Sequence, residues 1–307
     1  MSREGKRLLD IGEDALIERI TKSWNETIKH GASIYGKPWL FLGVGDDCAI
    51  LRTQNPRVFQ LLKVDALVEG VHFLPDTPPE RIGWKAMARV VSDVAAMGGY
   101  PVSALITLGT PRTEFVDRID KIYRGLNRCA REFGISLAGG ETTAAPFLFL
   151  SVTLTGLVES KRATTRCFAK DGDAIMVTGT LGGSNRGKHL SFMPRLHEAR
   201  WLVEHYKPNA MMDISDGLAA DLPRLERANS LHAHIDLECI PRTEGCTIEQ
   251  ALCDGEDYEL LFTLPQRTVD ALKADWPFRL PVTQIGYFSK KPSHKKFENG
   301  FDHFLKR

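Results

Sequence analysis

The sequence has no surplus of charge and no long hydrophobic run. Its 40 lysines and arginines face 39 aspartates and glutamates, which leaves a formal net charge of +1 over 307 residues. A surface that binds nucleic acid or an anionic membrane through electrostatics normally carries a clear basic excess. The most apolar stretch, residues 147–158, is too short to span a bilayer and contains one serine and two threonines. We therefore expect neither a nucleic-acid nor a membrane partner.

The sequence also lacks the cysteine spacings of disulfide scaffolds and zinc sites. None of its six cysteines forms a Cys-x-x-Cys pair, and none has a histidine at zinc-binding spacing. Residues 1–6 are mostly polar or charged and do not form the apolar core of a secretory signal. Because disulfides belong to oxidising compartments, we expect buried free thiols and a cytoplasmic location.

Strands and helices alternate along the chain, without repeats, coiled-coil heptads or low-complexity segments. Helical spacing of apolar residues predicts helices over 13–28, 81–97, 114–133, 195–206 and 217–228. Apolar runs rich in β-branched and aromatic residues predict strands over 58–64, 103–108, 135–138, 147–158, 174–178, 234–237, 259–264 and 282–287. The length predicts two domains, and a charged stretch at 159–162 marks a crossing between residues 1–158 and 159–307. The expected fold class is α/β (α+β).

Two acids flank a serine just before one of the predicted helices. Asp213 and Asp216 stand on either side of Ser215, and Gly217 follows them. Carboxylates this close repel each other unless a cation neutralises them. Hard divalent cations such as Mg²⁺ prefer carboxylate oxygens and often bring phosphates with them. A helix N-cap with one spare surface acid is the competing interpretation of this segment alone.

Acidic segments of this kind recur along the chain. Each follows an apolar strand or helix and carries carboxylates, mostly beside glycine: 43–47, 64–65, 92–93, 139–143, 213–217 and 254–259. Glycine and aspartate are also ordinary turn residues, so any one segment is a weak signal. Together the segments place many acids at the ends of elements, where open α/β folds build their sites. The pattern predicts several cations held between the protein and a polyphosphate.

With these segments in view, the sequence resembles the thiamine-monophosphate kinases, a family in the superfamily of aminoimidazole ribonucleotide synthetase. Matching motifs run in order along nearly the whole chain. They lie at 12–13, 16–17, 42–49, 65–73, 83–86, 92–98, 139–143, 177–182, 213–222, 255–260 and 300–304. So many ordered matches are not expected by chance.

The resemblance implies a homodimer in which the N-terminal sheets of two subunits form a shared barrel, each flanked by a C-terminal α/β domain. ATP would lie in the cleft between the domains, and its γ-phosphoryl group would move onto the phosphate of thiamine monophosphate to give thiamine diphosphate. One anion attacks another in this reaction, so several Mg²⁺ ions are needed to neutralise and align both phosphates.

The resemblance also assigns roles to individual residues through matching motif positions. The implied metal ligands are Asp47, Asp65, Asp93, Glu141, Asp213 and Asp216, of which Asp65 and Asp93 are also assigned to catalysis. The implied ATP contacts are Ser215, Arg166 and the backbone at Gly140 and Glu141. The residues expected to face the thiamine moiety are His72, Glu256 and Phe301. A structural histidine at position 72 and a core aromatic at position 301 are the competing interpretations.

Several positions depart from the family pattern. Lys63 and Val64 replace a Ser-Thr pair whose hydroxyls help to ligate metal, and neither can coordinate Mg²⁺. Glu141 replaces an aspartate, residues 90–91 replace Asn-Leu, and the segment 187–213 is short for the family. We interpret Lys63 as a fixed positive charge where one cation would otherwise sit, which leaves fewer metal ions. The competing interpretation is a nucleotide-binding pseudoenzyme, or a kinase or synthetase of the same superfamily that acts on another phosphorylated small molecule.

One glycine-rich segment resembles the phosphate-binding P-loop of another class of nucleotide-binding proteins. Residues 182–189 nearly spell a P-loop after a predicted strand. However, His189 stands where a serine or threonine must reach Mg²⁺. We therefore do not assign a P-loop to this segment.

Overall fold

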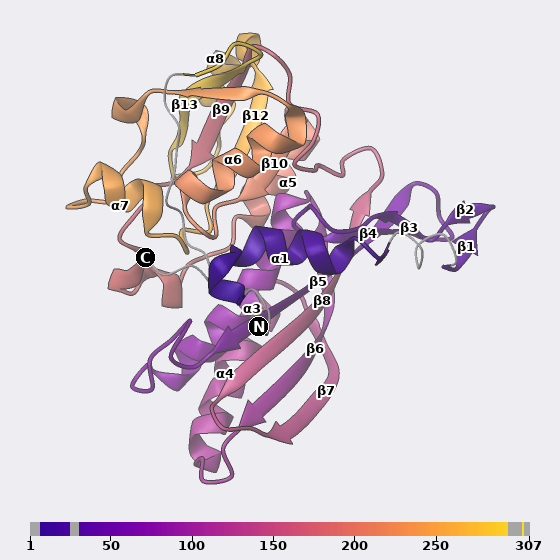
Figure 1. The fold of residues 1–307 in the computed structure, drawn as a ribbon, viewed down its shortest axis with the longest axis vertical. Coiled ribbons are helices and arrows are strands. Elements are labelled where there is room, and N and C mark those ends of the chain that lie inside the picture. Colours follow the sequence, from indigo (N-terminus) through magenta and orange to yellow (C-terminus); the bar gives the residue numbers. More distant parts are fainter. Residues whose placement is uncertain (1–6, 25–30, 294–302, 304–307) are drawn as a thin grey trace, which may run out of the picture.

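The computed structural model describes residues 7–24, 31–293 and 303, whose strands form two large sheets and one short hairpin (Figure 1). The larger sheet has six strands in the order β3–β4–β5–β8–β6–β7. Their bounds are Leu40–Leu42, Ala49–Arg52, Val58–Val68, Phe149–Glu159, Tyr100–Thr110 and Ser136–Ala144. All neighbours are antiparallel except β6 and β7, which are parallel. The hairpin pairs β1 (Ser33–Ile34) with β2 (Lys37–Pro38).

The second sheet has five strands in the order β10–β12–β9–β13–β11, and all neighbours are antiparallel. Their bounds are Ala210–Asp213, Leu260–Pro265, Asp173–Thr178, Val282–Ser289 and His232–Ile235. The predicted mixture of helices and strands is confirmed. Because the sheets are almost wholly antiparallel, the site does not form at the carboxyl ends of a parallel sheet, as the comparison with open α/β folds had suggested.

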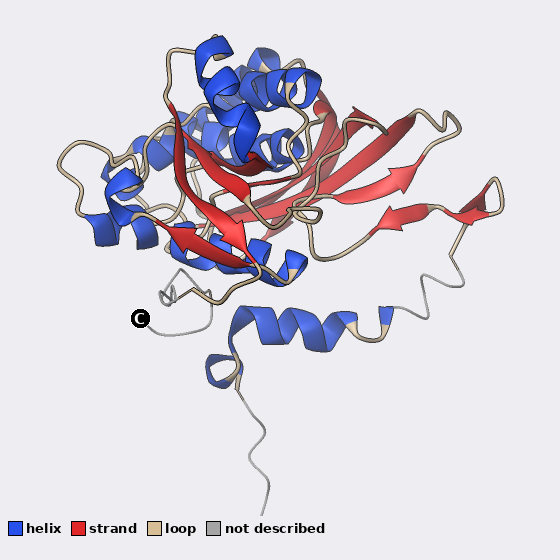
Figure 2. Cartoon of the chain, turned by 90° about the horizontal axis from the view of Figure 1, so that it is seen from above, coloured by secondary structure: helices blue, strands red, loops and turns tan. Residues whose placement is uncertain are grey.

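Helices accompany both sheets. In the N-terminal half these are α1 (Gly12–Thr21), α3 (Pro79–Ala96) and α4 (Val116–Glu132), and in the C-terminal half α5 (Leu196–His205), α6 (Leu218–Asn229), α7 (Ile248–Cys253) and α8 (Val269–Asp275). Helix α3 contacts β5 and β8 of the larger sheet and β10 of the smaller one, so it joins the two halves. Helix α1 runs along the outside of the body (Figure 2), where Asp14 accepts a 2.9 Å hydrogen bond from Arg227 of α6. None of the described helices is long and apolar enough to cross a membrane.

Helices α3 and α4 cross with their backbones in contact. A Cβ atom added at Gly83 of α3 would lie 1.9 Å from the carbonyl oxygen of Ile122, and one at Gly125 of α4 would lie 1.9 Å from that of Glu80. Only glycine lets two helices approach this closely. The predicted helices over 81–97 and 114–133 are confirmed, and the two glycines fix how they meet.

One hydrophobic cluster runs under both sheets. It joins Leu61 and Leu154 of the larger sheet, Val91 of α3, and Met176 and Phe262 of the smaller sheet, all of them fully buried. A second cluster lies under α6 and includes Ile175 and Leu222. Neighbouring residues of β9 thus enter different clusters, as the period of two along a strand requires.

Two predicted strand ends are wrong. Strand β5 continues to Val68, so Asp65 lies within a strand and not in a turn after it. Strand β7 runs through residues 139–143, which were expected to stop it. A Cβ atom at Gly140 would lie 1.8 Å from the carbonyl oxygen of Ile106 in β6. Gly140 therefore allows the backbones of β6 and β7 to approach closely. A pair of glycines in a sequence usually predicts the end of a strand instead.

Candidate functional site

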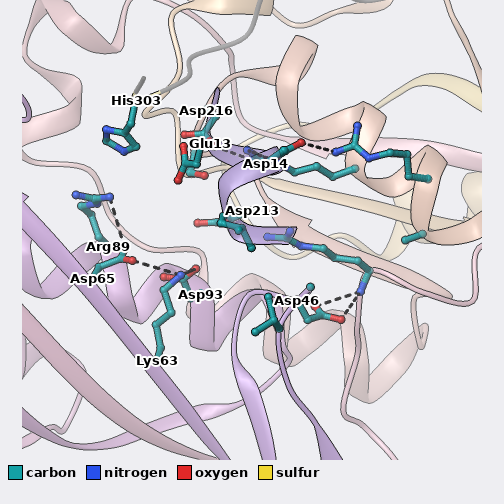
Figure 3. Close-up of a pocket in the computed structure, with 18 of the residues that line it drawn as sticks. Glu13, Asp14, Asp46, Lys63, Asp65, Arg89, Asp93, Asp213, Asp216 and His303 are labelled. Carbon is teal, nitrogen blue, oxygen red and sulfur yellow. Dashed lines mark hydrogen bonds and ion pairs between the residues drawn. The ribbon is translucent and has the colours of Figure 1, made fainter. Parts of the chain in front are cut away.

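A cavity of about 590 Å³ opens between the two sheets (Figure 3). Its wall is made by residues from α1, β5, α3, β10 and the loop that leads into α6. Of the residues singled out in the sequence, it is lined by Lys63, Asp65, Asp93, Arg166, Asp213, Ser215 and Asp216. The volume lies in the range of small-molecule and cofactor sites. Acids from both halves of the chain therefore face one cavity.

Three acids converge beside this cavity, and two of them, Asp93 and Asp213, line it. Among the described residues, Asp47, Asp93 and Asp213 each offer a carboxylate oxygen within 4.8 Å of the others, and all three are buried. Asp47 precedes β4, Asp93 lies in the last turn of α3, and Asp213 ends β10. No described group donates a hydrogen bond to Oδ2 of Asp47, although this atom is buried. Converging carboxylates with an unpaired buried oxygen are the ligand set that a hard divalent cation requires.

The electrostatics of two of these acids, Asp93 and Asp213, favour a bound cation. Burial and the neighbouring Asp47 raise the pKa of Asp213 to about 7, even though Ser92 Oγ donates a 2.5 Å hydrogen bond to Asp213 Oδ2. Burial also raises the pKa of Asp93 well above its usual range. Carboxylates that are hard to ionise together hold protons until a cation replaces them.

Asp65 lies beside this cluster but is held by cationic side chains. Lys63 Nζ is 2.7 Å from Asp93 Oδ1 and 3.4 Å from Asp65 Oδ1. On the other side, Arg89 Nη2 is 3.6 Å from Asp65 Oδ2. The period of two along β5 puts Lys63 and Asp65 on the same face of the sheet, toward α3. Lys63 thus stands where the sequence predicted a fixed positive charge.

Asp216 lines the cavity but pairs with an arginine. Arg224 Nη1 lies 2.6 Å from both Asp216 Oδ2 and Asp221 Oδ1. Oδ2 of Asp221 accepts the backbone N–H groups of Ser215 and Asp216, each at 3.0 Å. Burial raises the pKa of the fully buried Asp221 to about 8. Sequence reasoning assigned no role to Asp221, which holds the loop before α6 by accepting these two backbone N–H groups.

Arg166 closes the side of the cluster nearest to Asp47. Its Nη2 atom is 2.5 Å from Asp47 Oδ1, and its backbone N–H lies 3.1 Å from Asp46 Oδ2. Burial and the neighbouring Asp47 raise the pKa of Asp46 to about 7. The guanidinium therefore reaches the cavity next to the acid cluster, where a phosphate group held by the cluster would meet it.

His72 and Glu256 are brought together by a buried lysine. Lys85 of α3 is fully buried, and its Nζ donates to the carbonyl oxygen of His72 at 2.7 Å and lies 2.6 Å from Glu256 Oε1. Burial lowers the pKa of Lys85 to about 8, against the opposing charge of Glu256. The Val68 N–H donates to Nδ1 of His72 at 3.1 Å, so the neutral ring carries its proton on Nε2. Burial and nearby Arg89 lower the pKa of His72 to about 3.

The loop that carries Glu256 contains two non-glycine residues with positive φ angles. Glu256 has φ +54° and Tyr258 has φ +52°, a left-handed conformation that non-glycine residues rarely adopt. Hydrogen bonds hold the loop there: the Glu256 N–H donates to Ser215 O at 2.7 Å, and the Tyr258 N–H donates to Ile214 O at 2.8 Å. The loop with Ser215 and the loop with Glu256 are therefore one unit.

The remaining predicted residues lie elsewhere. Gly140 and Glu141 are exposed in β7, at the edge of the larger sheet. Neither residue is among those that line the cavity. Phe301 lies outside the described residues. Sequence reasoning missed Lys85, Arg89 and Arg224, because a charged residue within a helical pattern is normally expected to face solvent.

The glycine-rich segment at 182–189 uses its lysine internally. Lys188 Nζ donates to Thr180 O at 2.9 Å and lies 3.4 Å from Glu259 Oε1. Arg195 holds the same Glu259 through two 2.6 Å hydrogen bonds. The ammonium group of Lys188 is thus used in contacts within the protein, as expected for a segment that is not a P-loop.

Comparisons with known proteins place this arrangement in a family. The family model of the AIR synthase related protein, N-terminal domain, matches residues 45–158, which hold β4 to β7, all but the last residue of β8, and Asp47, Asp65 and Asp93. This part of the chain thus matches the N-terminal domain of AIR synthase-related proteins. A thiamine-monophosphate kinase of Rhodopirellula baltica is 34% identical over 289 residues, covering 86% of this chain and 90% of the relative. One of Bacillus subtilis is also 34% identical, covering 83% and 87%. The chain belongs to the thiamine-monophosphate kinase family.

Solved structures agree with this assignment. A structure described as AaThiL complexed with AMPPCP and TMP superposes with a TM-score of 0.84 and 32% identity, over 98% of this chain and 100% of that one. The thiamine-monophosphate kinase of Stenotrophomonas maltophilia has a TM-score of 0.72 and 31% identity, over 88% and 94%. Hydrogenase maturation protein HypE, at 20% identity and a TM-score of 0.64, shares the fold alone.

Proposed function

We propose that this protein transfers the γ-phosphoryl group of ATP to the phosphate of thiamine monophosphate, which gives thiamine diphosphate. The observation that carries the proposal is the buried cluster of Asp47, Asp93 and Asp213, of which Asp93 and Asp213 line the cavity. Phosphoryl transfer between two anions demands charge neutralisation and alignment, and little covalent chemistry from the protein. The AaThiL structure with its AMPPCP and TMP supports the same pair of substrates for this chain.

The residues divide the work according to their chemistry. Asp47, Asp93 and Asp213 would hold Mg²⁺, which when bound neutralises phosphate oxygens and orients them. Ser215 and Arg166 line the cavity beside this cluster and would bind the phosphates of ATP. Gly140 and Glu141 remain predicted ATP contacts, and Asp65, Asp216 and Glu141 remain predicted metal ligands.

The acceptor end would be formed by His72, Glu256 and Phe301, as predicted from the sequence. Thiamine carries a positive charge, which a carboxylate such as Glu256 complements and a neutral histidine does not oppose. The low pKa of His72 keeps its ring neutral at physiological pH, so that it offers an N–H donor without charge.

The direct test is an assay with the purified full-length chain. Incubation with ATP, Mg²⁺ and thiamine monophosphate should yield thiamine diphosphate and ADP in equal amounts, measured by chromatography. ATP binding without any thiamine diphosphate, over a full series of Mg²⁺ and Mn²⁺ concentrations, would instead point to a nucleotide-binding protein without this activity.

Lys85 supplies a prediction about the acceptor end. Replacing it by methionine in Lys85→Met should raise KM for thiamine monophosphate at least tenfold and leave KM for ATP unchanged. The reason is that Glu256 loses its 2.6 Å ion pair and the His72 carbonyl loses its donor. Steady-state kinetics with each substrate varied in turn would measure both constants. Lys121→Met, which removes an exposed lysine paired within α4 to Asp117, is the matched control. An equal rise in both KM values would contradict a local role.

We also propose that the chain forms a homodimer through the open face of the larger sheet, with residues 1–158 as the dimerising part and 159–307 as the second domain. Val64, Thr153 and Leu105 are neighbours in register across β5, β8 and β6, and therefore share one face. Val64 is 58% and Leu105 49% exposed, on the face away from α3. An apolar sheet face of this kind is normally covered by another protein surface. Strand β7 also ends the sheet with an open edge.

A charge on this face should separate the subunits. Val64→Glu is expected to change the molar mass in solution from that of two chains to that of one, because a carboxylate cannot be buried unpaired between apolar faces. Light scattering coupled to size-exclusion chromatography measures the mass directly. Phe115→Glu introduces the same charge at an exposed apolar residue before α4 and should leave the dimer intact. A monomeric wild-type chain would overturn the homodimer.

A further inference from the structure

The ammonium group of Lys63 lies between two carboxylates from different elements. Its Nζ is 2.7 Å from Asp93 Oδ1 on α3 and 3.4 Å from Asp65 Oδ1 on its own strand (Figure 3). Both carboxylates line the cavity, and so does Lys63. This is the position that a metal ion bridging the two acids would take, because such an ion also binds one oxygen from each.

Asp65 has a cationic neighbour at each oxygen. Oδ1 faces Lys63, and Oδ2 lies 3.6 Å from Arg89 Nη2. A divalent ion would have to break one of these ion pairs to bind Asp65, and it would then stand beside an ammonium of like charge. The electrostatics therefore oppose a metal ion on this side of the cavity.

The opposite side of the cluster is arranged differently. Asp47, Asp93 and Asp213 offer oxygens within 4.8 Å of one another. Arg166 Nη2 pairs with Oδ1 of Asp47, but Oδ2 of this buried residue has no hydrogen-bond partner among the described residues. Asp213 Oδ2 receives a hydrogen bond from neutral Ser92, which does not repel a cation. Asp47 thus keeps one buried carboxylate oxygen open to a divalent ion, whereas both oxygens of Asp65 face cationic groups.

We propose that Lys63 is a built-in cation that replaces a divalent metal ion between Asp65 and Asp93, so that metal binding is confined to the side of Asp47 and Asp213. Lys63 is then a positioning residue: it fixes the Asp93 carboxylate and supplies charge without exchanging with solvent ions. The inference rests on the proposed metal-dependent phosphoryl transfer, but metal counting tests it without turnover.

The experiment counts Mn²⁺, a spectroscopic substitute for Mg²⁺, on the full-length protein. Equilibrium dialysis and electron paramagnetic resonance give the number of tightly bound ions per chain, with and without a non-hydrolysable ATP analogue. Lys63→Thr is expected to bind one ion more per chain than the wild type, whereas Lys63→Arg should keep the wild-type number. Equal numbers for the wild type and a folded Lys63→Thr variant would overturn the proposal.

A second variant keeps the test decisive if Lys63→Thr does not fold. Asp65→Asn removes the acid that Lys63 withholds from the metal and leaves the 2.7 Å pair with Asp93 in place. The proposal expects an unchanged number of bound Mn²⁺ ions, whereas the loss of one ion would show that metal displaces Lys63. Absence of thiamine diphosphate with the expected metal counts would reject the proposed function alone.

Discussion

Replacing Asp213 by asparagine is expected to lower turnover at least 100-fold, equivalent to about 2.7 kcal/mol of activation free energy, and to raise the melting temperature of the metal-free protein. The first effect follows from the loss of a carboxylate that would hold the cation. The second follows from its crowding: Asp213 is buried within 4.8 Å of two other acids. Asparagine has the same shape and still accepts the hydrogen bond from Ser92. Function and stability should therefore change in opposite directions.

The pH dependence of stability checks the same argument. Burial and Asp47 raise the pKa of Asp213 from 3.8 to about 7 in the folded protein. A raised carboxyl pKa means that the folded state binds the proton more tightly than the unfolded state does. Protonation of Asp213 therefore stabilises the fold fully at acid pH, and this stabilisation is lost as the pH rises from about 4 to 7. The melting temperature of the wild type in a chelator should fall between about pH 4 and 7, and that of Asp213→Asn should fall less.

Thermal unfolding across this pH range and steady-state turnover are the two measurements. Asp270→Asn, at an exposed position of α8, makes the same chemical change outside the cavity and should leave both quantities at the wild-type level. Turnover of Asp213→Asn within tenfold of the wild type would show that Asp213 does not hold the catalytic cation.

Gly125→Ala is expected to destabilise the protein by about 2–3 kcal/mol, because the new methyl group would overpack the crossing of α3 and α4. Helix propensity alone favours alanine over glycine by about 1 kcal/mol. The clash outweighs this preference, since the added Cβ would lie 1.9 Å from the Glu80 carbonyl oxygen and α3 would have to move. That movement would also shift Lys85 and Asp93, which α3 carries, so turnover should fall together with stability.

Urea unfolding followed by circular dichroism measures the stability change. Asn127→Ala, on the exposed face of the same helix, changes helix propensity without affecting the contact between α3 and α4. It should change the free energy of unfolding only slightly, in either direction. A Gly125→Ala variant as stable as the wild type would mean that the two helices separate without cost.

The sequence predicted the elements well where apolar residues repeat with a clear period. Helix α3 was expected over 81–97 and spans Pro79–Ala96, and β8 was expected over 147–158 and spans Phe149–Glu159. Periodicity does not give strand order or direction, because these depend on which segments pair across the core. For that reason the antiparallel pairing and the extension of β7 through Gly140 became known only from the structure.

The site was predictable where chemistry depends on a short motif and unpredictable where it depends on distant partners. Asp93 and Asp213 stood out as acids at element ends, and the structure brings them together. Lys85 did not stand out, because its burial depends on Glu256 in a loop of the other half of the chain. Lys63 was singled out only because it departs from the family pattern. Its position between Asp65 and Asp93 became known only from the structure.

The hydrophobic cluster shared by the two sheets has a mechanical consequence for the acids above it. Asp93 is carried by α3 and Asp213 by β10, and both elements are anchored in this cluster. Close-packed interiors transmit strain and yield little, so the carboxylates cannot move apart to relieve their repulsion. Protons held by Asp93 and Asp213, whose pKa values are raised, relieve part of this repulsion when no cation is bound. A divalent cation held by these rigidly placed carboxylates would replace the protons and neutralise the remaining charge without any movement of α3 or β10.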